Sequence, residues 1–358
     1  MKILFCANDC IPIHAKLLDE RPLGGTETAI IHLAHELQEI GHQVNVLTKL
    51  ENPPLSSPLY LPINAISQLG YYDLFISIRD WKPLFLPIKA KLRFLWTGDA
   101  YDQPANIGIG DKRIAEQIDL LLCVSKWQLE TLCEESGFPK EKAWVLRNGV
   151  SLPLFQGSEI RLRKRLMYSS TPYRGLSHLL DLFPRILKRH SDAELHIFSG
   201  YAVYAGAEKY PNHIIREFEA MVQSFKKIPN VYLRGNIRQK DLAREFMSAS
   251  ILAYPNTFAE TSCISAIEAQ AGGCVVVSTK KAALIETVGD RGILIDGEPG
   301  QSSYNEAFVN SVDQLLSDDT YFYEISEKAK AWALKECGWK TIAQNLCEKI
   351  FALLQDSN

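Results

Sequence analysis

The sequence predicts an α/β fold made of two doubly wound, Rossmann-like domains that face a central cleft. Three observations predict it. The chain has 358 residues, which exceeds the usual size of one domain. Short apolar segments of strand length alternate with amphipathic segments of helix length. The alternation stops near residue 152 and restarts at residue 166, so that it forms two successive blocks.

Composition limits the function classes. The chain is 46% hydrophobic and 23% charged, which is ordinary for a soluble globular protein, and its net charge of −3 argues against a dedicated nucleic-acid binder. No apolar run approaches eighteen residues, so we expect at most peripheral membrane contact. The start, MKILFCAND, predicts a buried strand and not a signal peptide, and eight scattered cysteines without C-x-x-C indicate a reducing cytoplasm.

The first block predicts a domain over residues 1–155. Strands are expected over 2–7, 42–48, 73–77, 92–96, 120–125 and 143–150, and helices over 26–40, from 112 and over 127–136. The proline-rich segment 51–63 is expected to be a loop. Gly24 and Gly25 precede the first helix, where they form either a phosphate site or only a tight turn. Asp99 follows a strand, at the sheet edge where ligands of such folds bind.

The second block predicts a domain over residues 156–335. Strands are expected over 166–170, 194–199 and 231–234, in a segment that ends at 254, and over 274–278 and 292–295. Helices are expected over 176–189, 214–225 and 241–247, in segments that end at 271 and just before 332, and over 307–316 and 341–354. A turn is expected at Ile285 and Glu286. The basic run RLRKR at 161–165 is interpreted as a solvated linker.

The stretch FAETSCISAIEAQAGG, residues 258–273, carries two carboxylates, Glu260 and Glu268. Thr261 or Ser262 is expected to cap a helix, whose free N–H groups suit a phosphate. Glu268 lies among apolar helix residues, where a buried carboxylate is costly unless it is hydrogen-bonded. Hydroxyls of a phosphorylated sugar would bond both acids. The alternative is that Glu260 only complements the helix dipole and Glu268 faces water.

Arg174 lies in another strand-to-helix loop, beside the hydroxyl of Ser170. A guanidinium with neighbouring hydroxyls suits a diphosphate, although a surface arginine near a turn is equally compatible with the pattern. Strand-to-helix loops of this kind carry Gly24-Gly25, residues 170–174 and residues 261–263. The three loops meet at one cleft if the domains face each other. The sequence lacks G-x-S-x-G, H-E-x-x-H, P-loop and EF-hand patterns.

Taken in order, these motifs resemble the family-4 glycosyltransferases of the GT-B architecture over nearly the whole chain. The resemblance rests on Gly24-Gly25-Thr26-Glu27, on 145–150 with Phe155, on Arg174-Gly175-Leu176, on Gly235 with its loop, and on Trp339. The most specific motif is E-x7-E, Glu260 to Glu268. In this architecture the last segment, 336–358, is expected to pack back on the first domain.

The resemblance implies a role for each matching residue. Glu268 would accept the ribose hydroxyls of a nucleotide sugar, and Glu260 would contact hydroxyls of the transferred sugar. Gly24 and Gly25 would approach the diphosphate, with Gly235 in the same donor site. The backbone of Thr261, Ser262 and Cys263, together with Arg174 and Ser170, would hold the diphosphate. Asp99 joins Glu260 among the catalytic candidates.

The resemblance also implies the reaction: a hexose is moved with retention from a nucleotide-diphosphate sugar to an acceptor hydroxyl, without a metal or another cofactor. A UDP-sugar is favoured as co-substrate, and the acceptor is a carbohydrate, a lipid-linked molecule or a small molecule. No D-x-D is placed for a cation. Relatives carry His-Asp where this chain has Gly98-Asp99, and E-G-F-G where it has E-T-S-C. The missing imidazole motivates an alternative, a catalytically silent sugar-nucleotide-binding or scaffold protein.

Overall fold

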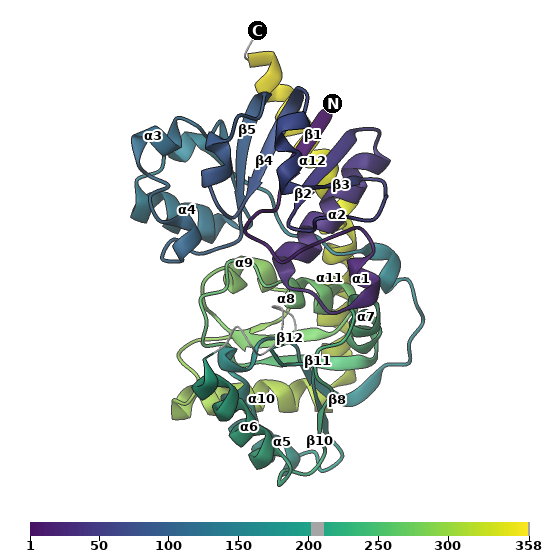
Figure 1. The fold of residues 1–358 in the computed structure, drawn as a ribbon. Helices are drawn as coiled ribbons and strands as arrows, with labels where there is room; N and C mark the ends of the chain where they lie inside the picture. The colour runs from purple at the N-terminus through teal and green to yellow at the C-terminus, as the bar shows by residue number, and fades with distance from the viewer. Residues whose placement is uncertain (202–210, 357–358) are drawn as a thin grey trace. The chain divides into compact units, whose positions relative to one another are not determined.

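The computed structural model describes residues 1–201 and 211–356, which form two compact units (Figure 1). Unit 1 consists of Met1–Leu18, Gly25–Gly149 and Cys337–Asn358, and unit 2 of Asp19–Gly24 and Val150–Glu336. Each unit contains one parallel sheet with helices, so the predicted class of two doubly wound α/β sheets is confirmed.

The sheet of unit 1 has the strand order β3-β2-β1-β4-β5-β6-β7, and all its pairs are parallel. Its strands are β1 (Lys2–Cys6), β2 (Gln43–Thr48), β3 (Leu59–Pro62), β4 (Tyr72–Ile78), β5 (Ala90–Thr97), β6 (Leu120–Cys123) and β7 (Ala143–Val145). From β1 the next strands in sequence, β2 and β3, are added on one side, and from β4 the strands β5, β6 and β7 are added on the other side. The carboxyl ends of these two neighbours are therefore the place where ligands usually bind in such sheets.

The helices of unit 1 are α2 (Gly25–Glu39), α3 (Lys112–Ala115), α4 (Lys126–Ser136) and α12 (Trp339–Asp356), while α1 (Leu17–Glu20) spans the division between the units. Leu129 and Leu132 of α4 join the apolar core with strand residues such as Phe75. Helices α2 and α12 pack against each other. At the start of α12, Trp339 lies so close to Gly149 that a Cβ there would be 2.6 Å from Cδ2 of the indole.

The sheet of unit 2 has the order β10-β9-β8-β11-β12-β13 and is also parallel. Its strands are β8 (Leu162–Tyr168), β9 (Glu194–Ile197), β10 (Val231–Leu233), β11 (Ala249–Tyr254), β12 (Val275–Thr279) and β13 (Ile293–Ile295). Here the order reverses between β8 and β11. All six residues of β11 and all five of β12 are buried, as expected for the centre of a sheet covered on both faces.

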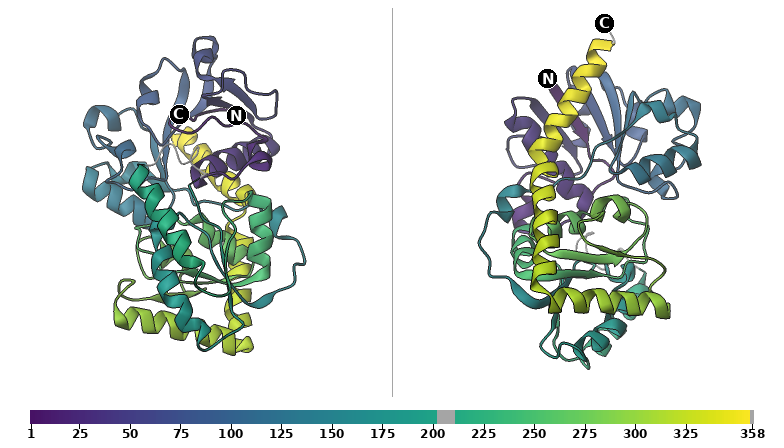
Figure 2. Two further views of the ribbon diagram at one scale, coloured as in Figure 1. Left: turned by 60° about the horizontal axis from the view of Figure 1, so that its bottom comes forward. Right: turned by 180° about the vertical axis from the view of Figure 1, so that it is seen from behind.

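The helices of unit 2 are α5 (Leu176–Leu187), α6 (Asn212–Phe225), α7 (Gln239–Ser248), α8 (Ile264–Ala271), α9 (Leu284–Val288), α10 (Ser302–Ser317) and α11 (Asp319–Glu336). Helix α10 packs with α5, and α8 packs with α7 and α11. Two further views show α11 and α10 in this unit (Figure 2). Short 3-10 turns complete the fold at 63–68, 82–85, 104–106, 140–142, 152–155 and 172–174.

Several local predictions were wrong. Strand β3 lies within the segment expected to be only a loop, because Leu59 to Pro62 pair with β2 despite the nearby prolines. Strand β7 ends at Val145, five residues earlier than expected. The turn expected at Ile285 is part of helix α9, and α11 continues past Trp332 to Glu336.

The basic run 161–165 is not a solvated linker, because residues from Leu162 onward form β8, next to the central strand. Arg161 donates to the backbone oxygens of Phe246 at 3.0 Å, Gly272 at 2.5 Å and Ala249. Arg163 donates to Leu315 O at 2.6 Å, and its guanidinium carbon lies 3.7 Å from the centre of the Phe322 ring. These cations satisfy carbonyl groups at the ends of helices, so the run is structural.

Within residues 1–201 and 211–356, no helix combines the length and the apolar character needed to cross a bilayer.

Candidate functional site

The candidate site in unit 2 lies at the carboxyl ends of β8 and β11, where the strand order reverses. The loop after β8 contains Gly175, whose φ is 115°. A Cβ on this residue would lie 2.1 Å from the backbone oxygen of Pro255, which follows β11. Only glycine permits this conformation and this approach together. The close approach brings the loop of Arg174 against the loop that carries Glu260.

Glu260 is bound by a cation and a phenol. Nη1 of Arg174 donates to its Oε1 at 3.0 Å and to its Oε2 at 3.1 Å. The hydroxyl of Tyr254, the last residue of β11, donates to Oε1 at 2.5 Å. Ser170 Oγ lies 3.2 Å from the same hydroxyl. The structure thus brings Ser170, Arg174 and Glu260 into one hydrogen-bonded cluster.

This cluster is removed from water. The side chain of Glu260 is 7% exposed and that of Arg174 is 21% exposed, so the alternative of a surface arginine is wrong. Burial, followed by the negative charge of Glu260, raises the pKa of Tyr254 well above its ordinary value. The phenol therefore remains protonated and acts as a hydrogen-bond donor to the carboxylate at neutral pH.

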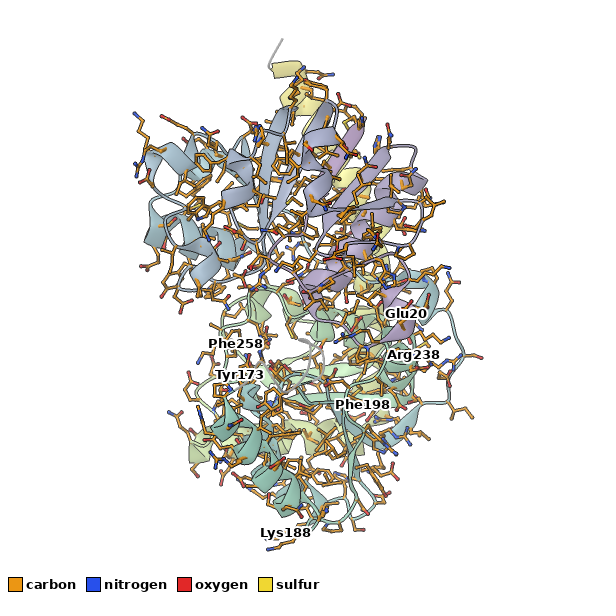
Figure 3. The ribbon with its side chains drawn as sticks, viewed as in Figure 1. Glu20, Tyr173, Lys188, Phe198, Arg238 and Phe258 are labelled. Atoms are coloured by element: carbon orange, nitrogen blue, oxygen red, sulfur yellow. The ribbon has the colours of Figure 1, made fainter. Side chains whose placement is uncertain are left out.

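Two aromatic rings flank Arg174. Its guanidinium carbon lies 4.2 Å from the centre of the Phe258 ring and 5.7 Å from that of Tyr173. The two rings meet edge to face, with their centres 6.3 Å apart, and they lie near each other in Figure 3. Tyr173 is half exposed. Stacking on a ring face restrains a planar guanidinium, so these rings help to fix the orientation of Arg174.

The start of α8 differs from the prediction. Neither Thr261 nor Ser262 caps the helix; the capping position is Cys263, which has φ 71° and makes no capping hydrogen bond through its side chain. Ser262 is buried, and its backbone oxygen accepts the hydroxyl of Thr287 at 2.7 Å. The chain thus enters α8 through a left-handed residue, which for a non-glycine residue is uncommon. The polar side chains before the helix had suggested a cap that tertiary contacts override.

Glu268 lies in the middle of α8 and is 5% exposed, so the alternative that it faces water is wrong. Its Oε1 accepts Nε2 of Gln239, the first residue of α7, at 2.9 Å. Burial raises the pKa of Glu268 to about 7, although the bond from Gln239 lowers it. This carboxyl therefore changes charge near neutral pH. Such a perturbed acid beside a helix start is typical of a binding site.

The remaining donor candidates are three glycines. Gly235 follows the edge strand β10 with φ 69°, and a Cβ there would meet nothing within 4 Å. Gly24 is buried and is the last residue of its segment in unit 2, whereas Gly25 is exposed and begins α2 in unit 1.

In unit 1, Asp99 is held by an arginine that sequence reasoning missed. Arg79 donates Nε to Asp99 Oδ2 at 2.8 Å and Nη2 to Oδ1 at 3.0 Å. Burial lowers the pKa of Arg79, but the bonds and charge of Asp99 outweigh this and raise it overall. Arg79 follows β4 with φ 63°, and its Nε is 4.0 Å from Asp9, which follows β1. Arg79 thus ties Asp99, which follows β5, to the loop after β4, one of the two strands between which the strand order reverses.

The other residues that sequence reasoning missed are Tyr254, Phe258 and Gln239. For Tyr254 and Arg79 a signal existed, because a polar group at or just after the end of a buried strand is placed where ligands bind. For Gln239 no local signal existed, since its partner is twenty-nine residues away in sequence. Among the described residues, no group of three or more His, Cys, Asp or Glu is arranged to hold a metal ion.

The chain is similar to known proteins in sequence and in fold. Residues 163–318 match the family model of the Glycosyl transferases group 1. An MMP alpha-(1->4)-mannosyltransferase of Mycolicibacterium hassiacum is 28% identical over 238 residues, 65% of this chain and 54% of that protein. A lipopolysaccharide 1,2-N-acetylglucosaminetransferase of Salmonella typhimurium is 24% identical over 193 residues, 52% and 47% of the two chains. The chain thus spans about half the length of these curated relatives.

Solved structures share the fold. The sucrose-phosphate synthase of Thermosynechococcus elongatus has a TM-score of 0.73 at 15% identity, over 100% of both chains. HepE of Anabaena, solved in complex with UDP-glucose, has a TM-score of 0.71 at 16% identity, over 98% of this chain and 100% of that one. The resemblance to GT-B glycosyltransferases predicted from the motifs is confirmed. The matched segment, residues 163–318, is thus similar to the glycosyl transferases group 1 family, over less than half of the chain.

Proposed function

We propose that this protein is a retaining, metal-independent glycosyltransferase that moves a hexose from a nucleotide-diphosphate sugar to an acceptor hydroxyl. The observation that carries the proposal is the pair of buried carboxylates in unit 2. Glu260 is paired with Arg174, and Glu268, in the middle of α8, is bonded to Gln239 at the start of α7. Two buried acids on one loop and helix are costly for an apolar protein core, but they match a ligand that offers hydroxyls.

In this proposal Glu268 accepts the ribose hydroxyls, and Glu260 accepts hydroxyls of the transferred sugar. The start of α8 supplies backbone N–H groups near the diphosphate. Arg174 supplies positive charge there, while its Nη1 is bonded to Glu260. As the sugar–phosphate bond breaks, the acceptor hydroxyl attacks from the face that the diphosphate leaves, and a phosphate oxygen takes its proton. These donors stabilise the charge that develops on the leaving group.

The base of the donor is proposed to be uridine, which is supported by the fold shared with HepE, a protein solved with UDP-glucose. Independence from metal is proposed because the sequence lacks D-x-D. The acceptor is proposed to be a carbohydrate, a lipid-linked molecule or a small molecule, bound near Asp99. Transfer that continues unchanged in EDTA would support metal independence, and loss of transfer restored by a divalent cation would contradict it.

A second candidate, a silent sugar-nucleotide-binding protein, is favoured by one observation. Gly98 stands beside Asp99 without the imidazole of relatives, and a Cβ at Gly98 would meet nothing within 4 Å. The site therefore has room for a side chain and does not contain one. If the protein is silent for this reason, Gly98→His should create transfer activity that the natural chain lacks.

One experiment separates the candidates. A thermal-shift screen tests UDP, GDP and ADP, and their conjugates with glucose, mannose and N-acetylglucosamine. A cognate ligand raises the melting temperature because it stabilises the folded state by mass action. The best donor is then incubated with an acceptor panel, and products are detected by mass spectrometry. Stabilisation with product supports the enzyme, and stabilisation without product over the whole panel supports the silent binder. No stabilisation by any nucleotide would contradict both.

A further inference from the structure

The contacts of Glu260 are unequal at its two oxygens. Oε1 receives Nη1 of Arg174 at 3.0 Å and the hydroxyl of Tyr254 at 2.5 Å. Oε2 receives only Nη1, at 3.1 Å, among the described contacts. A carboxylate oxygen accepts about two hydrogen bonds. Oε1 is therefore saturated within the protein, whereas Oε2 retains capacity for one further donor.

The phenol of Tyr254 is itself fixed. Its ring is buried and meets the ring of Tyr168 edge to face, with the centres 5.7 Å apart. Ser170 Oγ is 3.2 Å from the hydroxyl, and the backbone oxygen of Tyr254 accepts the hydroxyl of Ser278 at 2.7 Å. A side chain held at its ring and at its hydroxyl has few rotamers to choose from, so it can orient a partner with little loss of entropy.

We infer that Tyr254 is a positioning residue: together with Arg174 it fixes the carboxylate of Glu260 so that Oε2 is the oxygen that accepts a hydroxyl of the donor sugar. The inference rests on the proposed function, since it assigns an atom and a partner within the same site. The inference also assigns recognition of the sugar and recognition of the nucleotide to different residues. The phenol acts on recognition of the sugar, whereas the nucleotide is recognised elsewhere, at Glu268 and the start of α8.

The chain provides a matched control. Tyr168 is also a buried tyrosine at the end of a central strand, and it contacts Tyr254. Its hydroxyl donates to the backbone oxygen of Thr171 at 2.8 Å and not to Glu260. Tyr254→Phe and Tyr168→Phe each remove one buried hydroxyl and keep the ring, so both proteins are expected to fold. Melting temperatures check this.

The test is a double-mutant cycle read by calorimetry with the nucleotide sugar that gives the largest thermal shift in the panel, and with its free nucleotide diphosphate. Tyr254→Phe should weaken binding of the nucleotide sugar about tenfold or more and leave the free nucleotide within about twofold. In the Glu260→Gln background, Tyr254→Phe should have almost no further effect, because its partner is already altered. Tyr168→Phe should have the same effect in both backgrounds.

Two results would overturn the inference. Tyr254→Phe could weaken the free nucleotide and the nucleotide sugar equally, or its effect could be the same in the natural background and in the Glu260→Gln background. Either result would show a merely structural phenol, while the proposed function would stand because the natural chain binds donor. Failure of the natural chain to bind any panel member would instead overturn the proposed function, and the inference with it.

Discussion

Arg174 uses one guanidinium nitrogen, Nη1, to bind both carboxylate oxygens of Glu260, at 3.0 and 3.1 Å. The two residues are eighty-six positions apart in the chain and belong to loops after two neighbouring strands, β8 and β11. The pair links the two loops of the candidate donor site. It also means that the cation expected to meet a diphosphate is partly neutralised before any ligand binds.

Loss of this cation should destabilise the protein. Arg174→Ala leaves the buried carboxylate of Glu260 without its counter-charge, which we expect to lower the free energy of unfolding by about 3 kcal/mol. The double variant Arg174→Ala with Glu260→Gln should recover part of this loss, because no charge then remains unpaired. Urea unfolding measures both. Equal stability of the single and double variants would show that the ion pair does not matter to the fold.

The buried acid Glu268 should make stability depend on pH. Its pKa is raised from 4.5 to about 7, so between these values the unfolded chain has lost the proton that the folded protein keeps. Stability from this group is therefore fully present below about pH 4.5 and falls as the pH rises to about 7, by about 3 kcal/mol in total.

Glu268→Gln should remove that fall, so that the variant is more stable than the natural chain at pH 8 and similar to it at pH 5. Urea unfolding at several pH values checks this, with Glu135→Gln, at an exposed acid, as the control that leaves the pH dependence unchanged. The burial argument would be contradicted if the stability of the natural protein fell no more steeply between pH 5 and 7 than the stability of Glu268→Gln.

Gly175 should tolerate no side chain. Gly175→Ala places a Cβ 2.1 Å from Pro255 O at a φ of 115°, so the loop of Arg174 must move away from that of Glu260. We expect a loss of at least about 3 kcal/mol in stability, or failure to fold. Gly98→Ala is the control, because a Cβ there meets nothing within 4 Å. A Gly175→Ala protein as stable as Gly98→Ala would refute the close approach.

Much of this fold follows from the sequence. The apolar runs of strand length set the central strands β11 and β12, because a strand covered on both faces must be apolar throughout. Strand β3 was missed because a proline precedes it, another is its last residue, and only one of its four residues is buried. The cap of α8 was misassigned because left-handed Cys263 depends on contacts outside the local sequence, such as that of Thr287 with Ser262.

The candidate site was predictable in part. Glu260, Glu268 and Arg174 were found from motif and position, because acids and cations in strand-to-helix loops suit a phosphorylated sugar. Their protein partners were not. Tyr254, Gln239 and Arg79 interact through tertiary contacts that no spacing rule encodes, and the aromatic stacking of Phe258 on Arg174 has the same origin.

The basic run gives a prediction that separates its two interpretations. Arg161→Ala removes a partly buried cation that bonds three backbone oxygens, so we expect a loss of about 2–4 kcal/mol in stability. A solvated linker residue would change stability by no more than about 0.5 kcal/mol, as expected for Lys188→Ala at an exposed position (Figure 3). Denaturant unfolding compares the two. Equal effects would restore the linker interpretation.

The most direct measurement is a calorimetric titration of the natural chain and of Glu268→Ala with the nucleotide diphosphate that stabilises the protein most. If Glu268 accepts the ribose hydroxyls, the natural chain binds the nucleotide, and the variant binds it at least about a hundredfold more weakly while remaining folded. An unchanged affinity in Glu268→Ala would contradict the assignment of the donor site, and with it the proposal that the buried acids of unit 2 exist to bind a nucleotide sugar.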